Sequence, residues 1–263
     1  MSSGAMSPRE SPVGGGRTHL GRAGFETGAD TYERARPGYP DPAVAHLGSA
    51  LRLGPGSRVL DVAAGTGKLT RHLAADGMTC LALEPSASMR RVFRRVSPAV
   101  PVVAGTAEMI PVVTGAFDAV VVAQAFHWFD PARALAEFSR VLRPGGGLAL
   151  VWNERDETHP TVAELTRISK WDRCQPYPVG RDFGTDIDHS GLFGPVERTR
   201  FPFVQLLSLD DFVGQVASRS YIQVLPEPDR RAVLDRVEAF GATLGEPIEV
   251  PYVTDLFCTR SPG

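Results

Sequence analysis

Hydrophobic and polar positions in the first half of the chain follow two patterns in turn. Apolar runs such as Val59–Val62 and Phe117–Ala123 have the length of a strand. After Gly67, by contrast, Leu69 and Leu73 recur at helical spacing. The first pattern is typical of buried strands, and the second is typical of helices that pack one face on a core. We therefore expect an α/β fold in which the apolar runs form central parallel strands.

Glycine, proline and capping residues predict where the other elements begin and end, with Asp41 and Ser86 as expected N-caps and Asp130-Pro131 as an expected helix start. The expected helices cover residues 41–51, 68–76, 87–95, 130–143, 162–174, 209–218 and 228–244. The expected strands cover residues 59–62, 78–83, 100–103, 117–123, 148–152, 196–204 and 248–259. Pro37 and Pro40 predict that residues 31–40 have no regular structure. A loop broken by proline and glycine is expected between residues 174 and 196.

The turn Ala63–Gly67 connects the first strand to its helix, and its glycines leave room for a ligand against bare backbone. A P-loop needs Gly in place of Val62 and Ser or Thr in place of Leu69, so the turn does not fit ATP or GTP. A dinucleotide fold needs Gly or Ala in place of Thr70. S-adenosylmethionine has no phosphate and requires only a close backbone and nearby acids.

Several motifs resemble those of the class I S-adenosylmethionine-dependent methyltransferases. Residues 61–70 (D-x-A-A-G-T-G-x-L-T) are similar to motif I of that family. Residues 123–130 (A-x-x-x-H-W-F-D) resemble the type-11 branch, which includes trans-aconitate methyltransferase-like proteins, and residues 140–146 have the family's R-V-L-R-P-G-G sequence. The resemblance covers Tyr32 to Trp152. It implies a Rossmann-like, doubly wound, mostly parallel seven-stranded sheet in the order 3-2-1-4-5-7-6, with a helical insertion in the C-terminal part.

The chain is expected to divide into a leader and one domain. Residues 1–24 are rich in Ser, Gly and Pro, which predicts a disordered leader. Residues 25–263 are expected to form a single methyltransferase domain. Within it we expect residues 25–155 to bind the cofactor, and residues 156–263 to supply the substrate pocket and the last part of the sheet.

Cofactor-binding residues are expected near the ends of the predicted strands. Glu84 closes the second strand, where an acid accepts both ribose hydroxyls of a nucleoside. Tyr32 and Arg36 belong to a Y-x-x-x-R-P-x-Y-P segment, similar to an arm that closes over the cofactor; a solvated connector is the alternative. Thr106 stands where the family has Asp, so the contact to the adenine amino group is in question. The predicted set is Tyr32, Arg36, Asp61, Ala63, Gly65, Thr66, Gly67, Glu84, Pro85, Met89, Thr106, Ala107, Glu108, Ala123 and Gln124.

Acceptor-binding residues are expected around the aromatic stretch that follows the fourth strand. The predicted set is Tyr39, Phe126, His127, Trp128, Trp152 and Tyr221. His127 is the candidate general base because imidazole titrates near neutrality, and a histidine that only packs or orients is the alternative. Core packing is an equal alternative for Phe126 and Phe129. Ser218 and Arg219 are further candidates, with an exposed helix surface as an equal alternative.

Composition narrows the class of protein further. The chain has 28 basic and 30 acidic residues and a net charge of −2, which does not favour nucleic acid as a partner. The three cysteines are far apart, so neither a disulfide framework nor a metal site is expected. No apolar run has the length of a membrane span and no export signal is evident. We expect a cytoplasmic protein, monomeric or homodimeric, that acts on a small molecule and has no membrane partner.

The expected activity is transfer of a methyl group from S-adenosylmethionine to an oxygen, nitrogen or carbon nucleophile by in-line SN2 attack. Proximity and orientation in a dry pocket supply much of the rate of such a reaction. Two alternatives stay open at this point. One is an oxidoreductase that uses NAD, and the other is a non-catalytic protein that binds S-adenosylmethionine and recruits a partner.

Overall fold

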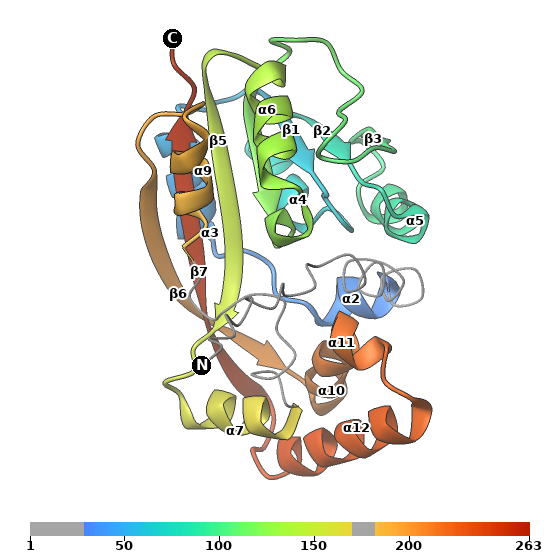
Figure 1. The fold of residues 1–263 in the computed structure, drawn as a ribbon. Helices are drawn as coiled ribbons and strands as arrows, with labels where there is room; N and C mark the ends of the chain where they lie inside the picture. The colour runs from blue at the N-terminus through green and yellow to red at the C-terminus, as the bar shows by residue number, and fades with distance from the viewer. Residues whose placement is uncertain (1–28, 170–181) are drawn as a thin grey trace, which may run out of the picture.

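A sheet of seven strands runs through the part of the chain that the computed structural model describes, residues 29–169 and 182–263 (Figure 1). Its order is β3-β2-β1-β4-β5-β7-β6, which confirms the predicted topology. Strands β1 to β5 pair in parallel, whereas β7 is antiparallel to both β5 and β6. The strands are β1 (Arg58–Val62), β2 (Thr79–Leu83), β3 (Val102–Val103), β4 (Phe117–Ala123), β5 (Leu142–Arg155), β6 (Glu197–Leu207) and β7 (Ile248–Arg260).

The central strands are buried on both faces because helices cover the sheet from two sides. Alternate residues of β4 point to opposite faces: Val120 and Val122 pack in one apolar cluster, and Ala119 and Val121 pack in the other. The first cluster is completed by α6 (Pro131–Val141) and α9 (Gly184–Ser190), which lie in front of the sheet in Figure 1. The second is completed by α3 (Asp41–Ala50) and α4 (Lys68–Ala75). This burial on both faces explains why the sequences of the central strands are continuous apolar runs.

Two predicted helices begin at their predicted caps, whereas Asp41 is the first residue of α3 and not its N-cap, because Pro40 takes the cap position without a side-chain hydrogen bond. Helix α5 (Ala87–Val96) begins after Ser86, whose Oγ accepts a hydrogen bond from the Met89 N–H at 3.3 Å. Helix α6 begins after Asp130, whose carboxylate accepts from the Arg133 N–H at 3.1 Å. Helices α10 (Leu209–Ala217) and α12 (Glu227–Gly241) lie within the ranges predicted for them or one residue beyond.

Three elements differ from the prediction. Residues 29–35 form helix α2 (Ala29–Ala35), although part of this range was expected to be irregular; the prolines end the helix before Pro37 and do not prevent it. Two further helices were not predicted: α9, and the single turn α11 (Ser220–Gln223). Helix α7 (Pro160–Ser169) confirms the start of the helix expected at 162–174, and the rest of that range lies outside the described residues, as does the leader expected at residues 1–24.

The helices of the C-terminal part form a separate layer at one end of the sheet. Apolar residues of α7, α10, α11 and α12 pack together with the ends of β6 and β7, as the predicted insertion requires. Helix α2 lies between this layer and α5 (Figure 1). The Arg34 guanidinium contacts the Asp211 carboxylate of α10 at 3.0 Å, and Asp30 pairs with Arg95 of α5. Helix α2 therefore links the insertion to the cofactor half of the domain.

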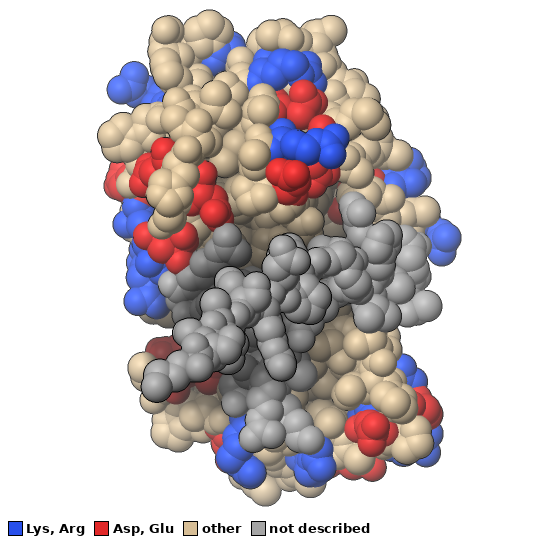
Figure 2. All heavy atoms as spheres, in the orientation of Figure 1, with Lys and Arg blue, Asp and Glu red and all other residues tan. Residues whose placement is uncertain are grey.

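The described surface is mixed in charge. Figure 2 shows basic and acidic side chains interspersed over the described part of one face, in keeping with the small net charge of the chain. Among residues 29–169 and 182–263, no helix combines the length and the apolar character that crossing a membrane requires.

Trp152 offers a test of the core. Its ring is fully buried and stacks on Phe183 with centroids 3.7 Å apart. We expect Trp152→Ala to lower the free energy of unfolding by roughly 3–5 kcal/mol, because it removes a large buried ring and leaves a cavity. Urea denaturation followed by circular dichroism measures this loss. Trp128→Ala, at a partly exposed ring, is the matched control and should cost much less. Equal stability of the two variants would contradict the assignment of Trp152 to the core.

Candidate active site

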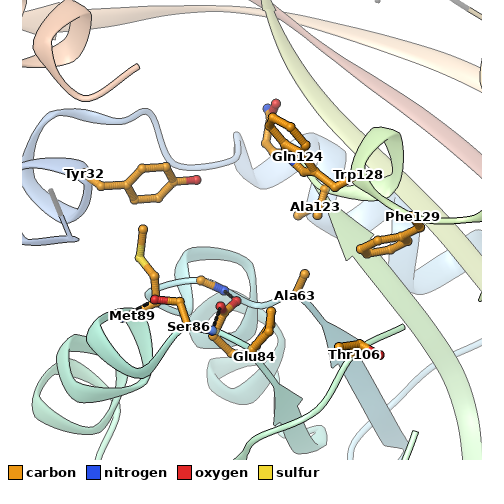
Figure 3. A pocket seen from close by; sticks show the side chains of 13 residues that line it. Tyr32, Ala63, Glu84, Ser86, Met89, Thr106, Ala123, Gln124, Trp128 and Phe129 are labelled. Carbon is orange, nitrogen blue, oxygen red and sulfur yellow. Dashed lines mark hydrogen bonds between the residues drawn. The ribbon is translucent and has the colours of Figure 1, made fainter. Parts of the chain in front are cut away.

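A cavity of about 430 Å³ opens beyond the carboxyl ends of β1, β2 and β4 (Figure 3). This is the edge at which open α/β sheets bind ligands, and the volume is in the range of small-molecule sites. Tyr32 and Met89 line one side, and Trp128 and Phe129 line the other. The complete wall consists of Tyr32, Ala63, Gly65, Glu84, Pro85, Ser86, Met89, Thr106, Ala123, Gln124, Ala125, Trp128 and Phe129.

Strained backbone marks the ends of two strands at this cavity. Ala63 follows β1 with φ of 56°, and Gln124 follows β4 with φ of 60°. Residues other than glycine rarely adopt this left-handed conformation, and it clusters at functional sites. Both residues line the cavity, so the two strands turn away just where a ligand needs access to their backbone.

The glycines of the turn after β1 have different roles. Gly67 has φ of 85°, and a Cβ built on it would lie 2.5 Å from the Phe93 ring, so this glycine permits the turn to pack on α5. Gly65 has φ of 59°, and a Cβ there would meet nothing within 4 Å because the residue faces the cavity. The predicted requirement for glycine therefore comes from packing at Gly67 and from backbone conformation and ligand access at Gly65.

Glu84 holds the turn after β1 against the end of β2. Its Oε2 accepts a hydrogen bond from the Gly65 N–H at 2.8 Å, and its Oε1 accepts from the Ser86 N–H at 2.7 Å. These bonds fix the carboxylate at the cavity wall (Figure 3). A carboxylate oxygen can accept more than one hydrogen bond, so a carboxylate in this place suits two adjacent hydroxyl donors on a ligand.

Asp61 is a second buried acid next to the turn. Its Oδ2 accepts a hydrogen bond from the Thr70 hydroxyl at 2.5 Å, whereas its Oδ1 has no partner among the described residues. Burial raises the pKa of Asp61 to about 7, the Thr70 hydrogen bond opposes this rise, and the charge of Glu84 adds to it. A buried carboxylate with an unused oxygen favours a cationic or hydrogen-bond-donating ligand in this region.

The segment that carries Thr106 is fixed by Arg140 of α6. This guanidinium donates to the Ile110 carbonyl at 2.9 Å and to the Val112 carbonyl at 2.8 Å, and Glu137 accepts from the Ile110 N–H at 2.7 Å. Arg140 is the first arginine of the R-V-L-R-P-G-G sequence. It does not line the cavity, but it holds the segment that follows Thr106. The motif can be recognised in the sequence, whereas the carbonyl groups that Arg140 contacts cannot.

The structure brings most of the predicted cofactor residues to the cavity. Those on the wall are Tyr32, Ala63, Gly65, Glu84, Pro85, Met89, Thr106, Ala123 and Gln124. Ser86, Ala125 and Phe129 also line it but were not in the predicted set. Ser86 was recognised only as a helix cap, and Phe129 was left undecided between core and site. The remaining predicted cofactor residues lie behind the wall: Arg36, Asp61, Thr66, Gly67, Ala107 and Glu108.

Three residues of this second set have other surroundings in the structure. The Glu108 carboxylate accepts from the Asp130 N–H at 3.1 Å, and Ala107 is buried in the core. Arg36 stacks over the Tyr32 ring, with its Cζ 5.3 Å from the centroid, and its Nε donates to the Ser218 hydroxyl at 3.0 Å. Burial, the largest cause, raises the pKa of the Tyr32 phenol.

The predicted acceptor residues separate into wall and core. Trp128 lines the cavity, and His127 lies beside it in the short helix η1 (Phe126–Trp128), with ring centroids 4.6 Å apart. Phe126 and Trp152 are fully buried among apolar residues that include Phe183, which corrects their assignment to the acceptor pocket. In the sequence, both follow or end an apolar run, where a ring that faces the core and a ring that faces a ligand cannot be distinguished.

Tyr39 and Tyr221 are two further predicted acceptor residues that do not line the cavity. Tyr39 is buried in the cluster with α3 and α4, and burial raises its pKa well above the usual value. Tyr221 packs against the apolar cluster of the insertion.

Comparison with known proteins agrees with this geometry. Residues 60–150 match the family described as Methyltransferase domain, of type 11. The uncharacterized methyltransferase Rv3342 of Mycobacterium tuberculosis is 40% identical over 245 residues, which cover 90% of this chain and 94% of that protein. The chain belongs to the class I S-adenosylmethionine-dependent methyltransferases. The narrower likeness to trans-aconitate methyltransferases stays a prediction.

Solved structures share the fold at low identity. A protein from Anaeromyxobacter dehalogenans assigned to the type II methyltransferases has a TM-score of 0.64 at 23% identity and covers 87% of this chain and 99% of its own. A Haemonchus contortus N-methyltransferase in complex with S-adenosylhomocysteine has a TM-score of 0.53 at 15% identity and covers 90% of this chain and 58% of its own. The enzyme described here is thus an S-adenosylmethionine-dependent methyltransferase, and not the NAD-dependent oxidoreductase kept as an alternative.

Glu84 gives a direct test of the cofactor site. We expect Glu84→Ala to weaken binding of S-adenosylhomocysteine at least tenfold, about 1.4 kcal/mol, because it removes the predicted acceptor for the ribose hydroxyls and the hydrogen bond that holds the Gly65 turn. Titration calorimetry measures the change, with the exposed Glu249→Gln variant as control. Unchanged affinity in Glu84→Ala would place the ribose elsewhere.

Asp61 predicts a dependence of stability on pH. Because its pKa rises from 3.8 to about 7 in the folded state, that state binds more protons than the unfolded chain in this interval, and stability falls as pH increases through it. We expect the wild type to lose stability relative to Asp61→Asn between about pH 4 and 7, by at most about 1.4 kcal/mol per pH unit. Denaturant titrations across this range measure the difference. Asp229→Asn on the surface is the control, and parallel pH curves for wild type and Asp61→Asn would refute the assignment.

Proposed function

We propose that this methyltransferase acts on a small-molecule acceptor with an oxygen, nitrogen or carbon nucleophile. The observation that supports the proposal is that helix α2 lies over the cavity. Helix α2 places Tyr32 on the wall and is held to α10 by Arg34 and Asp211 and to α5 by Asp30 and Arg95. A site covered in this way suits a small acceptor better than an extended macromolecule.

The residues present fit the cofactor on several grounds. Glu84 offers acceptors for a ribose, Gly65 leaves its backbone side open, and Asp61 has an unused buried oxygen. Thr106 and the backbone beside it are the candidates for the adenine end, and Tyr32 and Arg36 are the candidates for the methionine end. S-adenosylmethionine supplies an electrophilic methyl group on a sulfonium. Tyr32, Trp128 and Phe129 give this region an aromatic wall, and a wall of low polarity suits a reaction in which charge is neutralised.

His127 is the proposed general base where the acceptor must lose a proton. Helix η1 fixes it at the end of β4, beside the ring of Trp128, which lines the cavity. An imidazole in this place can take a proton from a hydroxyl or an ammonium group near neutral pH. Its alternative role is to orient the acceptor without accepting a proton.

Acceptor identity and the role of Trp128 are tested together. Small-molecule pools are incubated with enzyme and S-adenosylmethionine, and products are detected by the mass gain of one methyl group. With the acceptor found, we expect Trp128→Ala to raise KM for the acceptor about tenfold while the Kd for S-adenosylhomocysteine stays within about twofold. Trp128→Phe is the conservative control and should be close to wild type. A product only with protein or nucleic acid substrates would refute the proposed acceptor class.

A further inference from the structure

Gln124 combines a strained backbone with a place on the cavity wall. It follows β4 with φ of 60°, although it is not a glycine. Glycine adopts this left-handed conformation at much lower cost, and asparagine adopts it more readily than glutamine. A long polar side chain in such a conformation is more typical of a functional position than of a simple turn. The turn at the end of β4 therefore does not by itself explain the residue found there.

The side chain of Gln124 is oriented by the end of β5. Its Nε2 donates to the Asn153 carbonyl at 3.3 Å, and its backbone N–H donates to the Val151 carbonyl at 2.9 Å. Asn153 is itself fixed, because its Nδ2 donates to the Gly38 carbonyl at 2.7 Å and its Oδ1 accepts from the Thr254 hydroxyl at 2.7 Å. The Gln124 Oε1 makes no hydrogen bond with the described residues. The amide is therefore held in place and retains an acceptor for a ligand.

The wall around Gln124 is apolar. Ala123, Ala125 and Trp128 line the cavity beside it. Figure 3 shows Gln124 and Trp128 on the opposite side of the cavity from Glu84. A flat apolar surface with one amide beside it suits a ring that carries a hydrogen-bonding group.

This side of the cavity offers no charge to a ligand. Among the described residues that line the cavity, Glu84 and the Tyr32 phenol are the titratable groups. Burial, the largest cause, raises the pKa of Tyr32, which keeps the phenol neutral. A charged group placed against Trp128 would lose its hydration without gaining an opposite charge, and this costs free energy. The wall thus favours an acceptor that is uncharged at this point.

We propose that Gln124 determines which acceptor is methylated, because its side-chain amide hydrogen-bonds the polar group of an uncharged, planar acceptor that packs on the Trp128 ring. The inference rests on the proposed function, since it requires that a small acceptor enters this cavity. Phenols, aromatic amides and nitrogen heterocycles combine a flat apolar body with a hydrogen-bonding group. The Gln124 amide accepts through Oε1 and donates through the second N–H of Nε2, so it suits each of them.

Three planar probes of nearly the same shape test the inference without knowledge of the acceptor. Benzamide is neutral, benzoate is its anionic analogue, and benzamidinium is its cationic analogue. Each is titrated into the full chain with saturating S-adenosylhomocysteine, and binding is followed by saturation-transfer NMR. We expect benzamide to bind the wild type more tightly than either ion. Gln124→Leu removes the amide at similar size and should weaken benzamide binding about fivefold, while the Kd for S-adenosylhomocysteine stays within about twofold.

Stability distinguishes a role in binding from a role in the fold. Because glycine adopts a φ of 60° without strain, Gln124→Gly should be at least as stable to urea as the wild type and yet bind benzamide as weakly as Gln124→Leu. Arg52 has φ of 55° in the exposed turn after α3 and gives the matched control. Arg52→Gly should also keep or gain stability, but benzamide should bind it as it binds the wild type.

Any of four results would overturn the inference. They are absence of benzamide binding to the wild type, equal or tighter binding of either ion, unchanged benzamide affinity in Gln124→Leu, and loss of stability in Gln124→Gly but not in Arg52→Gly. The last result would assign Gln124 to the fold. The proposed function fails separately: if methylated products form only with protein or nucleic acid, no small acceptor exists, whatever the affinity for benzamide.

Discussion

The site depends on one carboxylate that joins two loops. Glu84, at the end of β2, accepts hydrogen bonds from the N–H groups of Gly65 and Ser86. One of these groups belongs to the turn after β1, and the other precedes α5. The acid therefore sets the distance between two strand ends and also faces the cavity between them. Any ligand that uses its oxygens binds to a position that the protein has already fixed, and preorganisation of this kind reduces the cost of binding.

Buried charges of opposite sign lie in different parts of the domain. Asp61 and Glu84 lie at the ends of β1 and β2, where burial works against a second negative charge and raises the pKa of Asp61. Arg155 and Arg219 lie on the insertion side, where burial works against a second positive charge and lowers the pKa of Arg219. A cationic ligand beside Asp61 would relieve the cost of burying this carboxylate, which is the arrangement expected for a sulfonium cofactor.

Local sequence patterns predicted the strands and helix ends that depend on interactions between neighbouring residues. The apolar run Phe117–Ala123 and the caps Ser86 and Asp130 form as expected, because strand burial and capping depend on neighbouring residues. The turn after β1 forms for the same reason, and its Ala63 and Gly65 line the cavity. Trp152 was assigned to the acceptor because it ends an apolar run at the ligand edge. Its ring instead stacks on Phe183, and no sequence pattern around Trp152 indicates this contact.

Long-range contacts explain why the acceptor side was hardest to predict. Helix α2 covers the cavity through Arg34 and Arg36, whose partners Asp211 and Ser218 lie in the C-terminal helical layer. Arg155 is likewise fixed by Gln215 of α10. A sequence shows each of these residues as an ordinary polar position on a helix or a strand end. Only the fold shows that these residues lie together where α2 and β5 meet the C-terminal helical layer.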